Sequence, residues 1–329
     1  MRILVVGGAG YIGSHVARHL IGHGHEVWVF DSLVRGHRAA APEGRLIVGD
    51  LGDGAGLEAC LRELRIEAVM HFAAFALVPE SVSDPALYYR NNVVGSLNLL
   101  DAMRAAGVPR IVFSSTCAVY GNCEPPIVEE TPRRPINPYG FTKLVIEHAL
   151  ADYAAAYGLG YSALRYFNAC GASGDGTIGE DHAPETHLIP LILEVALGRR
   201  ESVSIFGTDY PTPDGSCIRD YIHVEDLAEA HRLALERIAP GSPGLVLNLG
   251  TGQGVSVREV IESARRVTGH PIPAVERPRR PGDPAVLIAS AGAARRELGW
   301  TPKFTEIDAI VESAWRWHST HPRGFDDAP

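Results

Sequence analysis

The chain has 329 residues, of which 46% are hydrophobic and 21% charged, a balance typical of a globular protein with a large buried core. The formal net charge of -9 disfavours a general nucleic-acid binder, because such proteins usually present a basic face. No run reaches the ~20 apolar residues of a membrane span, and the five cysteines form no C-x-x-C pair, so we expect a cytoplasmic protein without membrane contact and with reduced thiols.

The first half of the chain alternates short apolar runs with helical patterns. The predicted strands are 2–7, 26–31, 45–50, 68–74, 110–116 and 162–168, and the predicted helices are 12–23, 54–65, 88–106 and 138–157. Continuous apolar strands that alternate with helices indicate a parallel sheet covered on both faces. We therefore predict an α/β protein with a Rossmann-type, doubly wound parallel sheet and a dinucleotide-binding domain over residues 1–170.

A glycine-rich segment, VVGGAGYIGSHV, follows the first predicted strand and opens a helix. Its glycines Gly7, Gly10 and Gly13 would allow a tight turn and a close approach of the backbone to a pyrophosphate at the helix N-terminus. Asp31 ends the next strand, where a carboxylate would bind the adenosine ribose hydroxyls and repel a 2′-phosphate. The segment therefore predicts NAD as the cofactor.

Nearby side chains leave two alternatives to weigh. Arg35 and Arg38 keep NADP open, because either could pair with a 2′-phosphate. His15, His19 and His23 recur every fourth residue, a spacing that can bind zinc. No carboxylate or cysteine completes that set in the sequence, and the first turn of the helix is committed to phosphate. We therefore predict no metal site.

A tyrosine and a lysine stand four residues apart at the start of the predicted helix 138–157, and so share one face of it. Lys143 is one of only two lysines in the chain, the other being Lys303, and it follows Tyr139. An ammonium close to a phenol lowers the pKa of the phenol, so the pair predicts a general base. The hydroxyl run 114–116 ends the fifth strand, at the sheet edge where ligands bind, and could hydrogen-bond a reacting alkoxide.

The pattern changes after residue 171, where Gly- and Pro-rich loops separate shorter helices. The predicted helices are 188–198, 225–237, 256–268, 290–298 and 305–318, and 245–252 is a strand that could return to the main sheet. We predict that residues 171–329 form a smaller mixed α/β substrate-binding lobe, with segments near 220–252 returning to the Rossmann domain.

Together, these motifs resemble a known family. The glycine loop, Asp31, the hydroxyl run and Y-x-x-x-K are similar to the extended short-chain dehydrogenase/reductase family. The segments RYFNACGA (165–172), HLIPLILEVALGRR (187–200) and IFGTDYPTPDGSCIRDYIHVEDLAEAH (205–231) resemble its UDP-glucose 4-epimerase branch. The resemblance runs from end to end, and the second-half segments are more specific than the glycine motif.

The resemblance implies roles for the residues at matching positions. In catalysis, Tyr139 would be the general base, Lys143 would hold the nicotinamide ribose and Thr116 would assist at the sugar hydroxyl. The implied NAD contacts are Gly7, Gly10, Tyr11, Ile12, Gly13, Asp31, Asp50, Leu51, Phe72, Ala73, Asn91, Tyr139, Lys143 and Phe167. The implied UDP-sugar contacts are Thr116, Tyr139, Asn168, His187, Leu188, Phe206, Arg219, Arg280 and Asp283.

The function implied by the resemblance is the NAD-dependent interconversion of UDP-glucose and UDP-galactose by 4-epimerisation through a transient 4-keto sugar. Cys117 and Ala118 stand where related dehydratases carry an Asp-Glu pair, which disfavours a dehydratase. Asn91 and Asn92 are adjacent, so the assignment of the NAD contact to Asn91 is open by one residue. The family also implies a homodimer. The apolar faces of the predicted helices 88–106 and 138–157 could pair as its four-helix interface, or could equally belong to the core.

Two other functions stay open. The chain could be a 4-epimerase of another UDP-sugar, namely UDP-N-acetylglucosamine, a UDP-pentose or a UDP-uronate. Leu287 stands where the family often has a Tyr at the gate of the sugar pocket, and a smaller gate would admit N-acetylated sugars. The chain could instead be a non-catalytic NAD-binding regulator, although the intact Tyr139, Lys143 and Thr116 argue against it because a sensor needs no poised base.

Overall fold

The computed structural model describes residues 1–280 and 282–325. In its first half the strands are β1 (Arg2–Val6), β2 (Glu26–Asp31), β3 (Leu46–Val48), β4 (Ala68–His71), β5 (Arg110–Thr116) and β6 (Gly160–Tyr166). The helices are α1 (Tyr11–Gly22), α2 (Gly54–Glu63), α3 (Val78–Ser83), α4 (Pro85–Tyr88), α5 (Gly95–Ala106) and α6 (Pro138–Tyr157). Short turns of helix lie at η1 (Arg38–Ala40), η2 (Tyr89–Val94) and η3 (Cys117–Val119).

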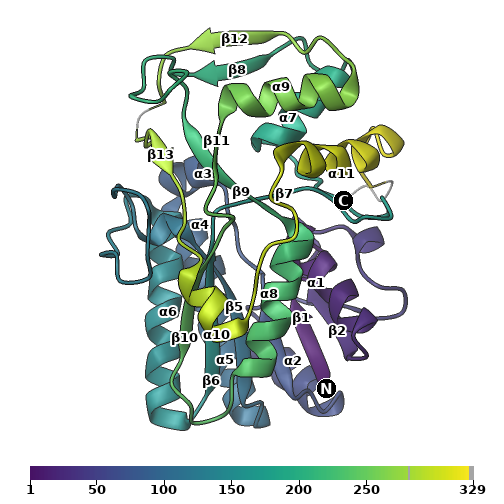
Figure 1. The fold of residues 1–329 in the computed structure, drawn as a ribbon. Coiled ribbons are helices and arrows are strands. Elements are labelled where there is room, and N and C mark those ends of the chain that lie inside the picture. The colour runs from purple at the N-terminus through teal and green to yellow at the C-terminus, as the bar shows by residue number, and fades with distance from the viewer. Residues whose placement is uncertain (281, 326–329) are drawn as a thin grey trace.

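These strands form a single parallel sheet. One strand of the second half, β10 (Leu245–Leu249), joins it. The order is β10-β6-β5-β4-β1-β2-β3, and each neighbouring pair is parallel. One apolar core lies between one face of the sheet and the helices α1 and α8 (Val224–Arg237), and a second lies between the opposite face and α2, α5 and α6 (Figure 1). The predicted α/β fold with a Rossmann-type sheet is confirmed, since continuous apolar strands were buried on both faces as their composition required.

The predicted helix 88–106 is a composite of three segments. It begins in α4, continues through the π-helical turn η2 and ends in α5. Within η2 the side chain of Asn92 is buried, accepts a hydrogen bond from the backbone N–H of Phe75 at 2.9 Å and donates to its carbonyl at 3.0 Å. The wider turn places this side chain so that it satisfies the backbone of the loop that follows β4.

The second half contributes elements to both ends of the molecule. Its strands are β7 (Asn168–Cys170), β8 (Val203–Phe206), β9 (Ile218–His223), β10 (Leu245–Leu249), β11 (Gly254–Ser256), β12 (Ala274–Arg277) and β13 (Val286–Leu287). Its helices are α7 (Leu188–Ala196), α8 (Val224–Arg237), α9 (Val257–Thr268), α10 (Gly292–Leu298) and α11 (Ile307–Thr320). The five predicted helices match these within a few residues, while the short strands β7, β8, β9, β11, β12 and β13 lacked a distinct sequence signal.

The strand β10 returns to the main sheet, where Leu247 pairs with Leu164 of β6. Helix α8 packs against α1, and α10 packs against β10 and α8, so both also belong with the sheet. At the top of Figure 1, α7, α9 and α11 pack together beside β8 and β12. Residue 281 and residues 326–329, which fall in the predicted lobe 171–329, lie outside the described residues, and the division into two domains stays a prediction.

The two groups of elements meet at the carboxyl ends of the main-sheet strands. Strand β6 leads directly into β7. Strand β7 pairs with β9 and is the fourth strand of the upper sheet, whose other strands have the order β11-β9-β13. Ligands of open α/β sheets bind at this edge, so the architecture puts the upper elements over the expected ligand site. Among the described residues, the structure has no helix long and apolar enough to cross a membrane.

Candidate active site

The glycine loop between β1 and α1 has the shape of a backbone cradle. Gly7 has a φ of +80°, and a Cβ there would collide with the backbone of Ala73. A Cβ on Gly13 would collide with the carbonyl oxygen of Gly7, whereas one on Gly10 would have only that oxygen nearby, at 3.5 Å. Gly7 and Gly13 therefore pack the loop against the protein, and Gly10 leaves its outer side free for a ligand. The residues present fit the pyrophosphate of a dinucleotide.

Asp31 lies at the end of β2 and fixes the loop from the other side. Its carboxylate accepts hydrogen bonds of 2.9 Å from the backbone N–H groups of Ala9 and Leu33. Burial raises the pKa of Asp31, and these two hydrogen bonds oppose the rise. Arg35, which could have favoured NADP, forms an ion pair of 2.7 Å with Glu80. The surroundings of Asp31 therefore favour NAD over NADP.

The other predicted cofactor contacts surround this loop. The hydroxyl of Tyr11 donates to the carbonyl of Gly171 at 2.7 Å, while Ile12 follows it in the first turn of α1. Phe72 and Ala73 directly follow β4. The side chains of Leu51 and Phe167 are buried, while Asp50 is exposed and accepts from the backbone N–H of Gly52. Asn91 is partly buried and donates to Asn92 at 2.8 Å. Asn92 is buried and already bonds the backbone of Phe75, so Asn91 is the better placed of the two to contact a ligand.

The start of α6 is built to bring its first turn against the end of β5. Asn137 is the N-cap, and its side-chain oxygen accepts from the backbone N–H of Gly140 at 2.8 Å. Pro138 suits the first helical position. A Cβ on Gly140 would press on the carbonyl of Ala118, at 2.5 Å, so only glycine allows this approach. As a result, Tyr139 lies within hydrogen-bond reach of Thr116.

Lys143 is buried beneath Tyr139. Its Nζ donates to the carbonyl of Ser114 at 2.7 Å and lies 6.0 Å from the centroid of the Tyr139 ring. Burial lowers the pKa of Lys143 to about 7, opposed by the charge of Glu147. Burial also raises the pKa of Tyr139 to about 12, opposed by its hydrogen bond with Thr116. The expected lowering of the Tyr139 pKa was wrong for this structure, because burial disfavours the phenolate and raises the pKa instead.

Beneath the lysine lies a buried ion pair that sequence reasoning missed. Glu147, on the same helix, receives two hydrogen bonds from Arg165 of β6, at 2.8 and 2.6 Å. The hydroxyl of Ser115 donates to the same carboxylate at 2.5 Å. Glu147 stands four residues after Lys143, a spacing that could have indicated it. No sequence signal links Arg165 or Ser115 to it.

The predicted UDP-sugar contacts beyond the catalytic residues line one pocket, of about 290 Å³. They are Asn168, His187, Leu188, Phe206, Arg219, Arg280 and Asp283. Asp283 pairs with both arginines, at 3.3 Å from Arg219 and 2.9 Å from Arg280, whose guanidinium lies 4.8 Å from the Phe206 ring centroid. Burial raises the pKa of Cys117 to about 12, and the charge of Arg219 opposes this rise, so Arg219 lies close to the residue that follows Thr116.

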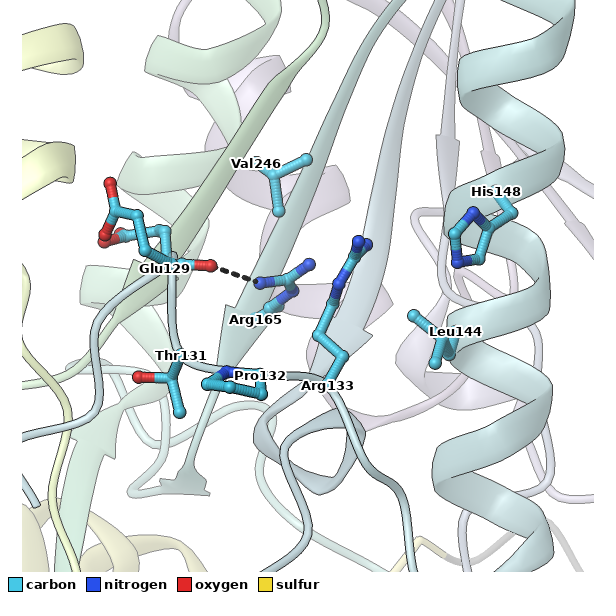
Figure 2. Close-up of a pocket in the computed structure, with 9 residues that line it drawn as sticks. Glu129, Thr131, Pro132, Arg133, Leu144, His148, Arg165 and Val246 are labelled. Atoms are coloured by element: carbon cyan, nitrogen blue, oxygen red, sulfur yellow. Dashed lines mark hydrogen bonds between the residues drawn. The ribbon is translucent and has the colours of Figure 1, made fainter. Parts of the chain in front are cut away.

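A second pocket, of about 490 Å³, lies beside α6, β6 and β10 (Figure 2). Arg133, Arg165 and His148 are among the side chains that line it, and Arg165 donates to the carbonyl of Glu129 at 3.5 Å. None of the predicted site residues lines this pocket. We therefore place the candidate active site at the smaller pocket and the glycine loop.

The structure corrects one argument about metals. The sequence offers no carboxylate that completes a zinc site with the histidines of α1. Glu229 of α8 supplies one, since its carboxylate lies 2.7 Å from Nε2 of His19, and His23 lies next to both. Arg232 binds the same carboxylate at 2.7 and 2.8 Å, however, so Glu229 already has a cationic partner.

Comparison with known proteins gives the same family along the whole chain. The sequence profile of the "NAD dependent epimerase/dehydratase family" matches residues 3–250. A UDP-glucose 4-epimerase of Streptomyces lividans is 55% identical, over 99% of this chain and 98% of that protein. One of Halalkalibacterium halodurans is 54% identical, over 99% and 98%.

Solved structures agree with this assignment. A crystal structure of a UDP-glucose 4-epimerase has a TM-score of 0.97 at 50% identity and covers 99% of this chain and 100% of its own. That of the Brucella ovis enzyme in complex with NAD has a TM-score of 0.93 at 51% identity and covers 95% and 97%. With its parallel sheet, glycine cradle and Tyr139–Lys143 pair, the chain belongs to the NAD dependent epimerase/dehydratase family.

Proposed function

We propose that this chain interconverts UDP-glucose and UDP-galactose by 4-epimerisation, with NAD as a bound cofactor and a transient 4-keto sugar as intermediate. One observation carries the proposal: seven residues assigned to the UDP-sugar, spread from Asn168 to Asp283, line one pocket. Relatives named UDP-glucose 4-epimerase that are more than half identical over nearly the whole chain support it.

The base that starts the reaction would be Tyr139. Its phenolic oxygen would take the proton of the sugar 4′-hydroxyl, with the hydroxyl of Thr116 hydrogen-bonded to the same centre. NAD, when bound, supplies the reversible hydride acceptor for carbon 4 of the sugar. Because the phenol has a pKa near 12 in this structure, the base needs added positive charge close by. Lys143 would supply it, since its Nζ lies 6.0 Å from the centroid of the Tyr139 ring.

The pocket would hold the nucleotide diphosphate while the sugar changes face. Arg219 and Arg280 are the cations that line it, and guanidinium groups pair well with phosphate oxygens. Both now share the carboxylate of Asp283, which would give way to the more highly charged diphosphate. Anchoring at the diphosphate leaves the 4-keto sugar able to turn and be reduced on its other face, with Tyr139 returning the proton.

We also infer a homodimer that buries the outer faces of η2 and α6. Four large apolar or aromatic side chains are exposed there, namely Tyr89, Val94, Phe141 and Tyr157. The rings of Tyr89 and Phe141 lie 6.4 Å apart, so the two segments share one surface. A second copy of the same surface would cover it, giving an isologous interface. Light scattering after gel filtration should give the dimer mass, and the charged substitution Phe141→Asp should give the monomer mass.

The sugar specificity is open to direct test. The protein, without added NAD, is incubated separately with UDP-galactose, UDP-N-acetylgalactosamine, UDP-xylose and UDP-glucuronate, and the products are separated by chromatography. The proposal expects UDP-glucose from UDP-galactose as the fastest conversion. Faster turnover of another sugar would reassign the substrate, and a protein that binds NAD but converts none of the four would be a regulator.

Leu287 gives a reason to test the N-acetylated sugars separately. Leu287 packs with a small apolar cluster that includes Phe167 and Cys117, close to the catalytic strand end. A leucine there occupies less space than the tyrosine that the family often carries. A structure named the UDP-Glc/GlcNAc 4-epimerase of Campylobacter jejuni is 40% identical, with a TM-score of 0.85. Leu287→Tyr should therefore reduce any turnover of UDP-N-acetylgalactosamine more than that of UDP-galactose.

A further inference from the structure

Two histidines and two carboxylates converge in the loop before α7. The segment GEDHAPETH contains Glu180, His182, Glu185 and His187 within eight residues. The carboxylate of Glu185 turns back over its own loop, where Oε1 accepts from the backbone N–H groups of Thr186 at 2.6 Å and His187 at 2.7 Å. This turn holds the carboxylate between the two imidazole rings, whose centroids are 5.1 Å apart.

The four groups lie close enough together to surround one ion. Nδ1 of His187 lies 2.9 Å from Oε1 of Glu180 and 3.0 Å from Oε1 of Glu185. Nδ1 of His182 lies 3.4 Å from Oε1 of Glu180 and 3.6 Å from Oε2 of Glu185. One nitrogen or oxygen from each residue lies within 4.8 Å of the others. Ligands about 2.0–2.2 Å from a tetrahedral zinc ion stand roughly 3.3–3.6 Å apart. The two His182 distances match this range, whereas the two His187 distances are those of hydrogen bonds and would have to lengthen around an ion.

We propose that Glu180, His182, Glu185 and His187 form a binding site for one divalent transition-metal ion, with zinc as the best fit. Imidazole nitrogen and carboxylate oxygen are both zinc ligands, and four protein ligands suit a closed tetrahedral site. Two carboxylates balance the charge of the ion when both imidazoles are neutral.

The state of His182 favours a metal over a plain set of ion pairs. Its Nδ1 is buried and makes no hydrogen bond in the structure, although two carboxylates lie 3.4 and 3.6 Å away. An unsatisfied buried nitrogen costs stability. A metal ion between the carboxylates and this nitrogen would satisfy it.

The His19–His23–Glu229 group of α1 and α8 serves as a contrast. It offers three groups rather than four, and Arg232 already binds its carboxylate through two nitrogens. No such guanidinium is paired with Glu180 or Glu185 among the ion pairs of the described residues. The two groups therefore make a matched comparison within one chain.

The proposed metal site borders the pocket described above. Glu180 and His187 line that pocket together with Arg219 and Arg280. On the other side, the ring of His182 meets the ring of Tyr11 edge-on, at 6.2 Å between centroids. The site thus lies between the glycine loop and the pocket. Metal binding itself does not depend on the proposed function.

The test measures metal directly. The full-length protein is stripped with a chelator, dialysed and titrated with zinc by calorimetry, and retained zinc is counted by mass spectrometry after gel filtration. Cobalt(II) serves as a second probe, because a tetrahedral site gives strong visible absorption bands. We expect one equivalent per chain, a tetrahedral cobalt spectrum, and at least about tenfold weaker binding in His182→Ala and in Glu185→Gln. His19→Ala should keep the full equivalent.

Several outcomes would overturn the proposal. They are retention of less than a stoichiometric amount of zinc, binding unchanged in both His182→Ala and Glu185→Gln, or loss of zinc in His19→Ala instead. Circular dichroism of each variant establishes that it is folded, and two independent ligand variants guard against one of them misfolding. Because no sugar is present, a failure here leaves the epimerase proposal untouched, and an absence of epimerase activity leaves the metal result standing.

Discussion

The ammonium of Lys143 donates to the backbone carbonyl of Ser114 at 2.7 Å, and this bond ties helix α6 to the end of strand β5. Both partners are buried, and the nitrogen also lies 4.9 Å from the centroid of the Phe113 ring. The compact charge therefore sits at a fixed point beneath Tyr139. A guanidinium is planar and longer, so it cannot occupy the same space without displacing the strand.

Lys143→Arg should therefore impair the reaction although it keeps the positive charge. We expect kcat to fall by about 100-fold or more, since a displaced cation no longer supports the base. Lys303→Arg, at the only other lysine of the chain, should leave kcat unchanged. Steady-state assays with UDP-galactose measure both, and full activity of Lys143→Arg would refute the positioning argument.

Tyr139→Phe should remove the base while leaving the cofactor site intact. We expect kcat to fall by about 10²–10⁴-fold with NAD still bound, because only the phenolic oxygen is lost. Tyr153→Phe is the matched control, since Tyr153 lies on the same helix and its hydroxyl bonds Asp101 at the surface. Absorbance of released NAD after denaturation measures occupancy. Near wild-type turnover in Tyr139→Phe would show that another group is the base.

Gly10→Ala should separate cofactor binding from folding. A Cβ at this position meets only Gly7, at an ordinary 3.5 Å, so the loop itself can keep its shape. The methyl group would instead project toward the side left free for the pyrophosphate, and NAD occupancy should drop while the melting temperature without cofactor holds. Gly22→Ala in the same helix, with nothing within 4 Å of its Cβ, is the control. Unchanged NAD retention in Gly10→Ala would show that the pyrophosphate does not lie against this glycine.

Arg165→Met should destabilise the protein strongly. Arg165 and Glu147 are both 2% exposed in their side chains. Without Arg165, the buried carboxylate keeps only a longer ion pair of 3.7 Å with the more exposed Arg133. We expect the free energy of unfolding to fall by about 3–5 kcal/mol. Arg62→Met, which breaks the exposed pair with Glu58, should cost less than about 1 kcal/mol. Urea denaturation measures both, and equal losses would mean that the buried pair contributes no more to the free energy of unfolding than the exposed pair.

Acid should destabilise the fold through buried neutral histidines. Burial lowers the pKa of His15 and His231 to about 4, and that of His71 and His223 to about 3. Unfolded histidine titrates near 6.5, so the unfolded chain binds more protons as the pH falls below that value. Their contribution to stability is present above pH 6.5 and is lost progressively toward pH 3–4.

The expected size of this effect is roughly 2 kcal/mol per histidine between pH 7 and pH 5. His231→Phe should flatten the pH dependence of the free energy of unfolding, whereas His270→Gln, at an exposed histidine, should not. Urea midpoints at pH 7 and pH 5 provide the measurement. A wild-type free energy that does not decrease between these pH values would contradict the burial argument.

The alternation of strands and helices, the glycine loop and the carboxylate of Asp31 could all be predicted from sequence. They depend on local periodicity and on backbone freedom at single residues, which a sequence displays directly. The π-helical turn around Asn92 could not be predicted, because the Asn92 side chain hydrogen-bonds the backbone of Phe75, a contact made only in the folded chain. The pKa of Tyr139 also differed from expectation, because its burial depends on tertiary packing.

The sequence by itself determined the fold class, the cofactor loop and the spacing of Tyr139 and Lys143, since each is written within one or two elements. Only the tertiary structure decided which distant charges share a site. Arg165 reaches Glu147 from a neighbouring strand, Glu229 reaches His19 across 210 residues, and Asn168 and Asp283 line one pocket. Such pairings follow from sheet order and helix packing, in which residues far apart in the chain become neighbours.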